Sequence, residues 1–597
     1  MKILYKNNKL ESVLIAINAV TAAAVLATFV MNFGFDKPVL PTSILYIVQI
    51  TCLVVFVFVK PIRLYNCVSR LDYLRVSWFE IPLLGGLLFA ILGAGRWFHV
   101  ADAGYFEIIV IEIYLVVQVV SKVCRTAVGL AASGKNPTQS LIISFVVLII
   151  CGAGLLMLPK ALNGGEMSFV DSLFTATSAT CVTGLVVKDT GSDFSLMGQV
   201  IILSLIQLGG LGIMIFGAVF ALLLGQALSV RESVAMQDLL NAQTLGRIAN
   251  LIGFIFIVTL GAEALGAFAM YGVWGDYALG MSTGHEQWFF SIFHSISAFC
   301  NAGFGLFNDS LVRMKGCWAV YAVICPLIVV GGLGFPVLYN VCNVLTDILK
   351  RWVGKFFFRR RSLSARLPKR FSLQTKIVLS MSVILIIAGA AGLMVFENNC
   401  HNNDNTANYE NPGISGAVFQ SITARTAGFN TVDIKSLSAA SKMLLIVLMV
   451  IGGSPASTAG GIKTVTFAII LMSAYATLRK RQEVEIFGRS LRLITLGRAL
   501  TVAILYISFL FVAIGALCLT ERHCGFAMGD IMFEEASALG TVGLTTGITG
   551  SLTTAGKFII IISMLVGRLG PLTLLASLTF NMKVSRYNYP SEAVLVG

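Results

Sequence analysis

Charged residues are scarce in this chain. Of its 597 residues only 12% are charged, whereas 57% are hydrophobic and the mean hydropathy is +0.86. Soluble domains carry about 25% charged residues, and most of those residues face water. Half that share cannot solvate the surface of a 64.1 kDa globule. The composition therefore excludes a soluble protein and indicates an all-α polytopic membrane protein.

Motifs of metal and catalytic chemistry are also missing. The 5 histidines and 12 cysteines form no CxxC pair and no metal-ligand spacing. HExxH and GxxxxGK[ST] do not occur, and GGIKT at 460–464 has Ile462 where a phosphate-binding loop needs glycine. His294 has no evident catalytic partner in the sequence. We therefore expect no enzyme activity and no covalently bound cofactor.

Apolar stretches of about 20 residues are long enough to cross a bilayer as helices. From 139 onward such stretches come in pairs, and each pair encloses a shorter segment rich in Ser, Thr and Gly that is too short to cross. The first stretch is too long for a signal peptide, and no small-residue cleavage site follows it. Twelve spans are predicted, near 13–33, 44–60, 78–98, 105–122, 139–159, 197–223, 249–273, 317–346, 374–396, 438–475, 499–519 and 556–580.

The formal net charge of +14 comes from basic residues that gather in a few loops. The segment 350–376 holds ten basic residues and no acidic one, and the loop 479–498 is also basic. Lys and Arg accumulate in the cytoplasmic loops of membrane proteins, so this distribution favours a topology signal over nucleic-acid binding. Twelve spans with both termini in the cytoplasm place every basic loop inside. Cys400 and Cys524 then lie outside, where they could pair.

The paired region contains a fourfold repeat, which is typical of a fold built from one recurring unit. Each short segment has a phenylalanine, a hydroxyl residue four positions later and a glycine five or six positions beyond that. A second glycine follows after 25, 28, 24 and 24 residues. The short segments are Phe174–Gly184, Phe293–Gly303, Phe419–Gly428 and Phe533–Gly543, and the later glycines, here called the landmark glycines, are Gly209, Gly331, Gly452 and Gly567.

Each unit predicts an outer helix, a re-entrant segment and an inner helix. Non-helical backbone at membrane depth is tolerated where it is buried in protein or lines a watery cavity, and four units around one axis supply such a cavity. The short helix would enter from outside with its partially negative end toward the pore. The next residues would turn their carbonyl oxygens to the axis, and a glycine would close each segment because it adopts positive φ freely. Rings of backbone carbonyls are how K⁺ filters replace a hydration shell.

These residues carry a resemblance. From about residue 137 to the end, the chain resembles the membrane subunit of the Trk/Ktr/HKT superfamily of potassium transporters. TATSATCVTGLVV at 175–187, TARTAGFNT at 423–431 and the Gly/Ser/Ala/Thr-rich run at 452–464 are most similar to the bacterial Ktr-type subunit. The resemblance covers about three quarters of the chain and does not explain the first 130 residues.

The resemblance implies a selectivity filter. In that family a glycine in each filter segment accompanies K⁺ preference, whereas serine in the first segment goes with Na⁺ permeation in some plant members. All four positions are glycine here, so we expect K⁺ to be preferred over Na⁺ and to bind at these residues. Packing glycines between helices are the alternative. The predicted filter consists of Val182, Thr183, Gly184, Asn301, Ala302, Gly303, Thr426, Ala427, Gly428, Thr541, Val542 and Gly543.

The third inner helix is interrupted at 452–464, where the other three continue with bulky apolar residues. Proline and glycine break a helix, so we expect a flexible loop at mid-membrane. The resemblance implies that this loop obstructs the pore below the filter as a gate, and a permanent kink without gating is the alternative. The predicted gate consists of Gly452, Gly453, Ser454, Pro455, Ala456, Ser457, Thr458, Ala459, Gly460, Gly461, Lys463 and Arg568.

Arg568 lies in the middle of a span, where an unpaired charge is costly. The resemblance implies an arginine at this place, near the gate. Two interpretations stay open: a guanidinium that adds an electrostatic barrier, or a structural cap for free carbonyls. We expect Glu534 and Glu535 to stabilise the pore wall or its outer mouth. For Glu112 and Glu263 we favour helix–helix pairing over ion coupling.

The resemblance also implies partners and a location. We expect a multi-pass protein of the bacterial inner membrane, embedded in the lipid bilayer, that forms a homodimer and binds no nucleic acid. A cytosolic ring of nucleotide-binding subunits would move the gate, and the basic loops 350–376 and 479–498 would contact it or serve topology alone. An inside-negative potential supplies about 2.3 kcal/mol per 100 mV for K⁺ entry. Channel-like K⁺ uptake is the first hypothesis, and a K⁺ symporter tightly coupled to Na⁺ or H⁺ is the alternative.

The predicted organisation has five parts. Four pseudo-repeats of helix, pore loop and helix surround one central pore. Four extra N-terminal helices precede them, and these lack the regularly spaced arginines of a voltage sensor. The boundaries are 1–136 for the N-terminal region, 137–246 for repeat 1, 247–372 for repeat 2, 373–498 for repeat 3 with the gating loop, and 499–597 for repeat 4.

Overall fold

A computed structural model gives the fold of the chain. Most of the predicted third and fourth spans, most of 213–247 and the basic run 358–367 lie outside the residues that it describes. The described residues are 6–71 without 36 and 38, then 73, 84–85, 110–112, 114–115, 118, 137–212, 215–216, 218–219, 248–274, 284–357, 368–403, 413–481, 483–571 and 575.

The described chain is almost entirely helical, which confirms the predicted all-α class. The one sheet among these residues is a hairpin of β1 (Glu485–Ile486) and β2 (Arg489–Ser490). In chain order the principal helices are α1 (Asn8–Phe33), α2 (Thr42–Asn66), α6 (Pro137–Leu156), α7 (Phe169–Cys181), α8 (Leu196–Leu211), α11 (Ile248–Met270), α13 (Gly284–Cys300), α14 (Cys325–Leu333), α15 (Phe335–Phe357), α16 (Leu373–Asn403), α17 (Gly413–Thr423), α18 (Ala439–Val450), α19 (Thr464–Leu478), α20 (Leu493–Thr520), α21 (Met528–Gly540) and α22 (Thr554–Leu569).

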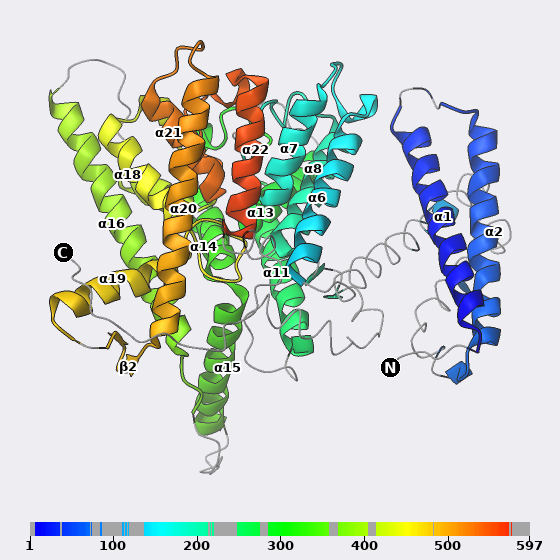
Figure 1. Ribbon diagram of the computed structural model, residues 1–597, viewed down its shortest axis with the longest axis horizontal. Helices are drawn as coiled ribbons and strands as arrows, with labels where there is room; N and C mark the ends of the chain where they lie inside the picture. The colour runs from blue at the N-terminus through cyan, green and yellow to red at the C-terminus, as the bar shows by residue number, and fades with distance from the viewer. Residues whose placement is uncertain are drawn as a thin grey trace, which may run out of the picture.

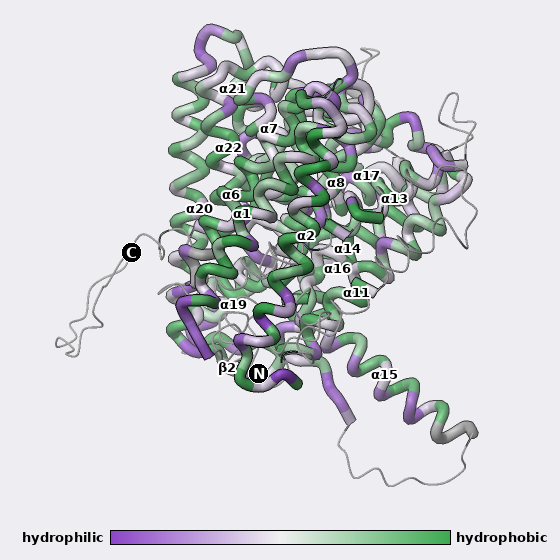
Figure 2. Tube along the Cα trace, turned by 90° about the vertical axis from the view of Figure 1, so that its right-hand side faces the viewer, coloured by the Kyte–Doolittle hydropathy of each residue, from purple (hydrophilic) through white to green (hydrophobic). Residues whose placement is uncertain are grey.

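The helices stand roughly side by side, with apolar residues along their length and polar residues gathered toward the two ends of the molecule (Figure 2). Among the described residues, α1, α2, α11, α16 and α20 are long and apolar enough to cross a membrane. Large apolar side chains on these helices point outward, such as Leu265, which is 73% exposed, and Phe511, which is 66% exposed. Outward apolar groups are favourable in lipid and costly in water, so this surface agrees with a polytopic membrane protein.

In each of the four units a short helix follows a longer outer helix, as the repeat predicts. The short helices α7, α13, α17 and α21 each pack against the outer helix of their own unit, α6, α11, α16 and α20 respectively. The shared phenylalanines Phe174, Phe293, Phe419 and Phe533 begin the repeated segments, and all four are completely buried. The aromatic signal in the sequence is therefore a packing signal, which fixes each short helix to the protein interior.

The expectation that only the third inner helix is interrupted was wrong. In the second unit α14 and α15 form one bent pair with an angle of 105° at Gly334, whose φ is +86°. The helices α8 and α22 also end at a glycine of positive φ, Gly212 and Gly570. Bulky apolar neighbours hid these breaks, because a single glycine can end a helix without any change in hydropathy.

The N-terminal helices α1 and α2 form an antiparallel pair beside the fourfold region (Figure 1). Asn7 caps α1, and the Asn66 side chain donates to the Asn7 carbonyl at 3.0 Å. Inside the pair, Arg63 forms an ion pair with Glu11 at 2.5 Å. The α1–α2 turn meets the fourfold region where the Lys160 amide donates to the Gly34 carbonyl at 3.2 Å. This pair is therefore anchored to the outer end of the first unit.

An ion pair joins the fourth unit to the first. Lys557 on α22 lies 2.7 Å from Asp171 in the first turn of α7, and both side chains are largely buried. Ser168 caps α7 and also donates to the Asp171 carboxylate, at 2.8 Å. The chain thus links its last unit to its first, and the four units form a closed ring.

Lys557→Met is expected to destabilise this ring. The substitution leaves the partly buried Asp171 carboxylate without its cation, which costs roughly 1–3 kcal/mol for a lost charged hydrogen bond. Thermal denaturation of the detergent-solubilised protein, followed by size-exclusion chromatography, should show a lower melting temperature. Lys442→Met is the matched control, because Lys442 donates to the Lys435 carbonyl at an exposed site and forms no ion pair among the described residues. Equal melting temperatures for the two variants would contradict a closing role for the ion pair.

Candidate functional site

Each short helix ends in the same backbone turn. A residue just beyond the helix takes a left-handed conformation, one position after the helix in repeats 1, 2 and 4 and three positions after it in repeat 3, and a glycine of positive φ follows two positions later. These pairs are Val182 (φ 59°) and Gly184 (92°), Asn301 (60°) and Gly303 (69°), Thr426 (79°) and Gly428 (83°), and Thr541 (49°) and Gly543 (91°). The four glycines were predicted. The left-handed side-chain residues were not, and their sequences share no feature that would have revealed them.

The repeated hydroxyl residue holds this turn from inside. In repeats 1 and 4 the serine accepts the filter-glycine amide: Gly184 donates to Ser178 Oγ and Gly543 to Ser537 Oγ, each at 3.1 Å. In repeats 2 and 3 the hydroxyl instead donates to the carbonyl that follows the glycine, from Ser297 to Phe304 at 2.8 Å and from Thr423 to Phe429 at 2.6 Å. The hydroxyl at the repeated position is therefore a structural brace in every unit.

The four glycines surround a single axis. A Cβ added at Gly184 would collide with the carbonyl oxygen of Ala302 and lie 3.2 Å from the Cα of Gly303. The same test gives one neighbour for each remaining glycine, in cyclic order. Gly303 meets the Ala427 carbonyl and Gly428, Gly428 meets the Val542 carbonyl and Gly543, and Gly543 meets the Thr183 carbonyl and Gly184. Segments more than a hundred residues apart thus converge on one constriction edged by backbone carbonyls.

The landmark glycines let each inner helix approach the end of its own short helix. A Cβ at Gly209, Gly331 or Gly567 would collide with a carbonyl oxygen at the end of α7, α13 or α21, namely that of Thr180, Phe299 or Leu539. In repeat 3 a Cβ at Gly452 would instead collide with the Gly460 carbonyl of the neighbouring loop. The similar spacing in the sequence is therefore explained by a close approach of two backbones in repeats 1, 2 and 4. In repeat 3 the landmark glycine contacts the loop instead.

The predicted gate residues form a non-helical loop, from Ile451 to Lys463, between α18 and α19. Its backbone pairs with the break between α14 and α15. Ser454 donates its amide to the Gly332 carbonyl at 3.0 Å, and the Phe335 amide donates to the Ala456 carbonyl at 3.0 Å. Within the loop, Lys463 Nζ donates to the Ala459 carbonyl at 2.7 Å. Two interrupted helices thus supply hydrogen-bond partners for each other's free backbone groups.

Arg568 connects this loop to two further units. Its guanidinium, on α22, donates to the Thr458 carbonyl in the loop and to the carbonyls of Gly209 and Gly210 at the end of α8. No carboxylate lies within ion-pair distance of it in the part of the chain that the structure describes. The guanidinium therefore caps the negative end of α8 and holds the loop at once. The interpretation of Arg568 as a cap for free carbonyls is supported by these contacts.

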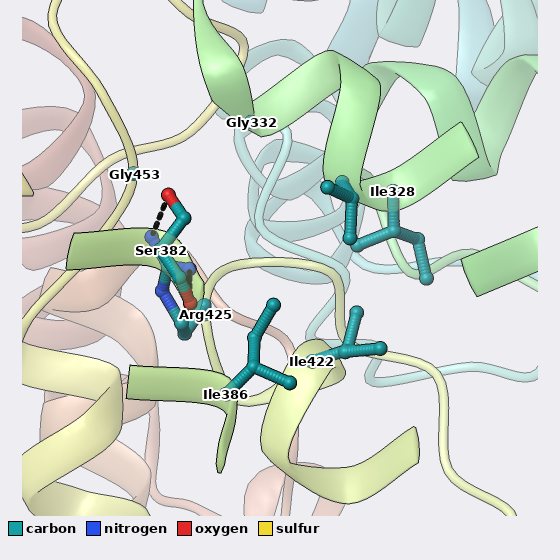
Figure 3. Close-up of a pocket in the computed structure, with 8 residues that line it drawn as sticks. Ile328, Gly332, Ser382, Ile386, Ile422, Arg425 and Gly453 are labelled. Atoms are coloured by element: carbon teal, nitrogen blue, oxygen red, sulfur yellow. Dashed lines mark hydrogen bonds between the residues drawn. The ribbon is translucent and has the colours of Figure 1, made fainter. Parts of the chain in front are cut away.

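A second partly buried arginine, which the sequence reasoning missed, lies beside the third short segment. Arg425 donates to the Ser382 carbonyl at 3.4 Å and to its hydroxyl at 3.5 Å, and its Nε has no partner among the described residues. It lines a small pocket with Ile386, Gly332 and Gly453, next to the loop (Figure 3). This filter segment is one residue shorter than the others, and Arg425 stands beside the shortened turn.

The acidic residues singled out in the sequence lie in different parts of the structure and have different hydrogen-bond partners. Glu263 on α11 accepts from Gln207 on α8 at 3.2 Å, which agrees with the predicted helix–helix pairing. Glu534 accepts from Thr545 and Thr549, just beyond the fourth filter glycine. Glu535 is completely buried. Cys524 donates to Glu521, while the Cys400 side chain lies outside the described residues, so their pairing stays a prediction.

Fold and site together define a class: a polytopic membrane protein with four pseudo-equivalent units around a constriction of backbone carbonyls, and a non-helical loop bound to the break between α14 and α15. Residues 107–587 match the family model of the cation transport protein TrkH. The chain belongs to this family. The predicted resemblance is thereby confirmed, and residues 1–106 lie outside the match.

Curated relatives agree with this assignment. The Ktr system potassium uptake protein B of Bacillus subtilis is 38% identical over 472 residues, which cover 77% of this chain and 97% of the relative. The potassium/sodium uptake protein NtpJ of Enterococcus hirae is 35% identical over 77% of this chain and 97% of the relative. The crystal structure of the potassium transporter TrkH from Vibrio parahaemolyticus has a TM-score of 0.56 at 18% identity, and the match covers 86% of this chain and 98% of that structure. At that identity the likeness shows the fold alone.

Gly209→Ala should disrupt the contact between α8 and α7. The added methyl group meets the backbone carbonyl of Thr180, which cannot rotate away, so overpacking is expected to cost roughly 1–3 kcal/mol. The fraction of protein that elutes as a monodisperse peak should fall. Gly261→Ala on α11 is the matched control, because no heavy atom lies within 4 Å of its added Cβ. A monodisperse fraction as high as that of the control would exclude a close approach at Gly209.

Proposed function

We propose that this chain is the ion-translocating subunit of a K⁺ uptake system and that its glycine ring is the selectivity filter. The carrying observation is the cyclic order in which each filter glycine meets the carbonyl of the next unit. Such a ring offers an ion several backbone oxygens at once, which is how K⁺ filters replace a hydration shell. The two relatives are named as uptake proteins for potassium and for potassium and sodium.

Unpaired hydroxyls at the filter support an ion pathway. The hydroxyls of Thr183, Thr426 and Thr541 are buried and have no hydrogen-bond partner among the described residues. A buried polar atom without a partner costs free energy unless water or an ion satisfies it. Hydrated ions passing along the axis would supply those partners.

The loop 452–463 acts as the gate in this proposal. Its middle, residues 454–458, is bound to the break at Gly334 and to Arg568 through backbone groups, while Ile462 at its end packs in the hydrophobic core. A segment held by a few hydrogen bonds opens at a lower cost than a packed helix. The Arg568 charge would also repel cations while the loop is closed.

A soluble nucleotide-binding ring would move this gate from the cytoplasmic face. The β1–β2 hairpin, the far end of α15 and the Asn7 end of α1 lie at the same end of the molecule (Figure 1). Described basic residues of the two loops, such as Lys350 and Arg351 on α15 and Arg489 on β2, belong to this end, which agrees with the predicted inside orientation. The relatives named as parts of a Ktr system point to a multi-component assembly. A homodimer of this chain, in the inner membrane of a bacterium, completes the proposal.

Gly184→Ser tests the filter. The side chain cannot coexist with a φ of +92° and with the Ala302 carbonyl, so the ring must distort and K⁺/Na⁺ discrimination should fall by about tenfold or more. K⁺ and Na⁺ uptake would be measured in cells deficient in K⁺ uptake that also express a soluble partner. Gly154→Ser on α6, where the added Cβ meets nothing within 4 Å, should keep the native ratio. An unchanged ratio in Gly184→Ser removes the filter assignment.

Shortening 454–461 tests the gate. Without the loop, K⁺ flux should become independent of the soluble partner. Arg568→Gln should move flux in the same direction, because it removes the bonds to Thr458 and to the end of α8. Flux into proteoliposomes that contain the chain alone would be compared with Arg522→Gln, an exposed arginine outside the loop contacts. Should both gate variants stay as silent as the control, the loop is not the gate.

A further inference from the structure

The four short helices differ at the position directly after the shared phenylalanine. Thr175, His294, Gln420 and Glu534 occupy it in repeats 1 to 4. All four side chains are buried. Because the backbone around this position is common to the four units, the four side chains can be compared at equivalent positions.

In repeat 4 this side chain fixes the segment that follows the filter. Thr545 Oγ1 donates to Glu534 Oε2 at 2.9 Å, and Thr549 Oγ1 donates to Oε1. The Gly547 amide in turn donates to Thr545 Oγ1 at 2.8 Å. One carboxylate thus holds the chain from two to six residues beyond Gly543.

In repeat 2 His294 does the same with an imidazole. Its Nδ1 lies 2.8 Å from the Phe290 carbonyl, and its Nε2 accepts the Leu306 amide at 3.4 Å. A single neutral tautomer satisfies both contacts, with the proton on Nδ1. The ring also lies against Trp274, with 4.7 Å between centroids. The chain three residues after Gly303 is therefore anchored to the second short helix.

Repeats 1 and 3 have no such anchor among the described residues. The Thr175 hydroxyl and both polar atoms of the Gln420 amide have no hydrogen-bond partner there. The filter glycines contact one another in the order of the repeats, so repeats 2 and 4 lie across the axis from each other. The two anchored filter segments face each other, and so do the two that lack an anchor.

We propose that Glu534 and His294 are positioning residues that brace two opposite filter segments from behind and thereby set the K⁺/Na⁺ discrimination. The proposal rests on the filter assignment made above. Na⁺ is smaller than K⁺, so the carbonyls must move inward to coordinate it as closely. A segment anchored beyond its glycine resists that movement, and the resulting mismatch disfavours Na⁺.

Glu534→Ala and His294→Ala test the braces in the full chain, expressed with a soluble partner in cells deficient in K⁺ uptake. Glu534→Ala should lower the ratio of K⁺ to Na⁺ uptake by about tenfold, and His294→Ala should lower it in the same direction. Gln420→Ala and Thr175→Val are the matched controls at the equivalent positions, and their ratios should stay within about twofold of the native ratio. A shift in Gln420→Ala as large as that in Glu534→Ala would overturn the proposal.

Thr549→Val separates bracing from folding. It removes the hydroxyl that reaches Glu534 but leaves the carboxylate with Thr545. The ratio of K⁺ to Na⁺ uptake should fall in Thr549→Val. The ratio of the double variant Thr549→Val and Glu534→Ala should be no lower than that of Glu534→Ala alone, because the two changes remove one shared interaction. A purely structural loss in Thr549→Val would lower K⁺ uptake and Na⁺ uptake by the same factor and leave their ratio unchanged. That result would overturn the proposal even if Glu534→Ala fails to fold.

Gly543→Ser distinguishes failure of the braces from failure of the filter. If Gly543→Ser changes the ratio while Glu534→Ala and Thr549→Val do not, the bracing role is wrong and the filter stands. If none of the three changes the ratio, the filter assignment itself fails.

Discussion

Backbone groups that leave a helix inside a membrane must find new partners, and this constraint governs the centre of the molecule. The break at Gly334 frees amides and carbonyls of the second unit, and the loop of the third unit pairs with them through Ser454 and Ala456. Carbonyls that remain free, at Thr458 and at the end of α8, accept from Arg568. Neither interruption would be tolerable alone, so the breaks and the arginine form one interdependent structure.

The same constraint explains why repeat 3 departs from its sisters. In the other units a landmark glycine brings the inner helix against the end of its own short helix. In repeat 3 Gly452 approaches Gly460 of its own loop instead, and the filter segment is one residue shorter. Arg425 stands behind that shortened turn, next to Gly453. Arg425 of the third short segment and Gly453 of the loop therefore line one small pocket.

Sequence patterns predicted those structural features that are determined by residues close together in the chain. The spacing of phenylalanine, hydroxyl and glycine reports burial, a hydrogen bond within one turn and a positive φ, so Phe174, Ser178 and Gly184 could be recognised together. The left-handed residue Val182 could not, because the turn around it imposes that conformation and the side chain does not favour it. The break at Gly334 was missed because its new hydrogen-bond partners lie over a hundred residues away, at Ser454 and Ala456.

Repeats 2 and 4 share a second property beyond the anchors behind the filter. Repeat 2 supplies the break that binds the loop, and repeat 4 supplies Arg568, which also binds it. Two opposite units thus hold both the proposed filter and the proposed gate, and Lys557 fixes one of them to the neighbouring unit. A loop that leaves its closed position loses contacts mainly with these two units. In the proposed assignment, the two units that brace the filter are therefore the ones whose contacts change when the loop moves.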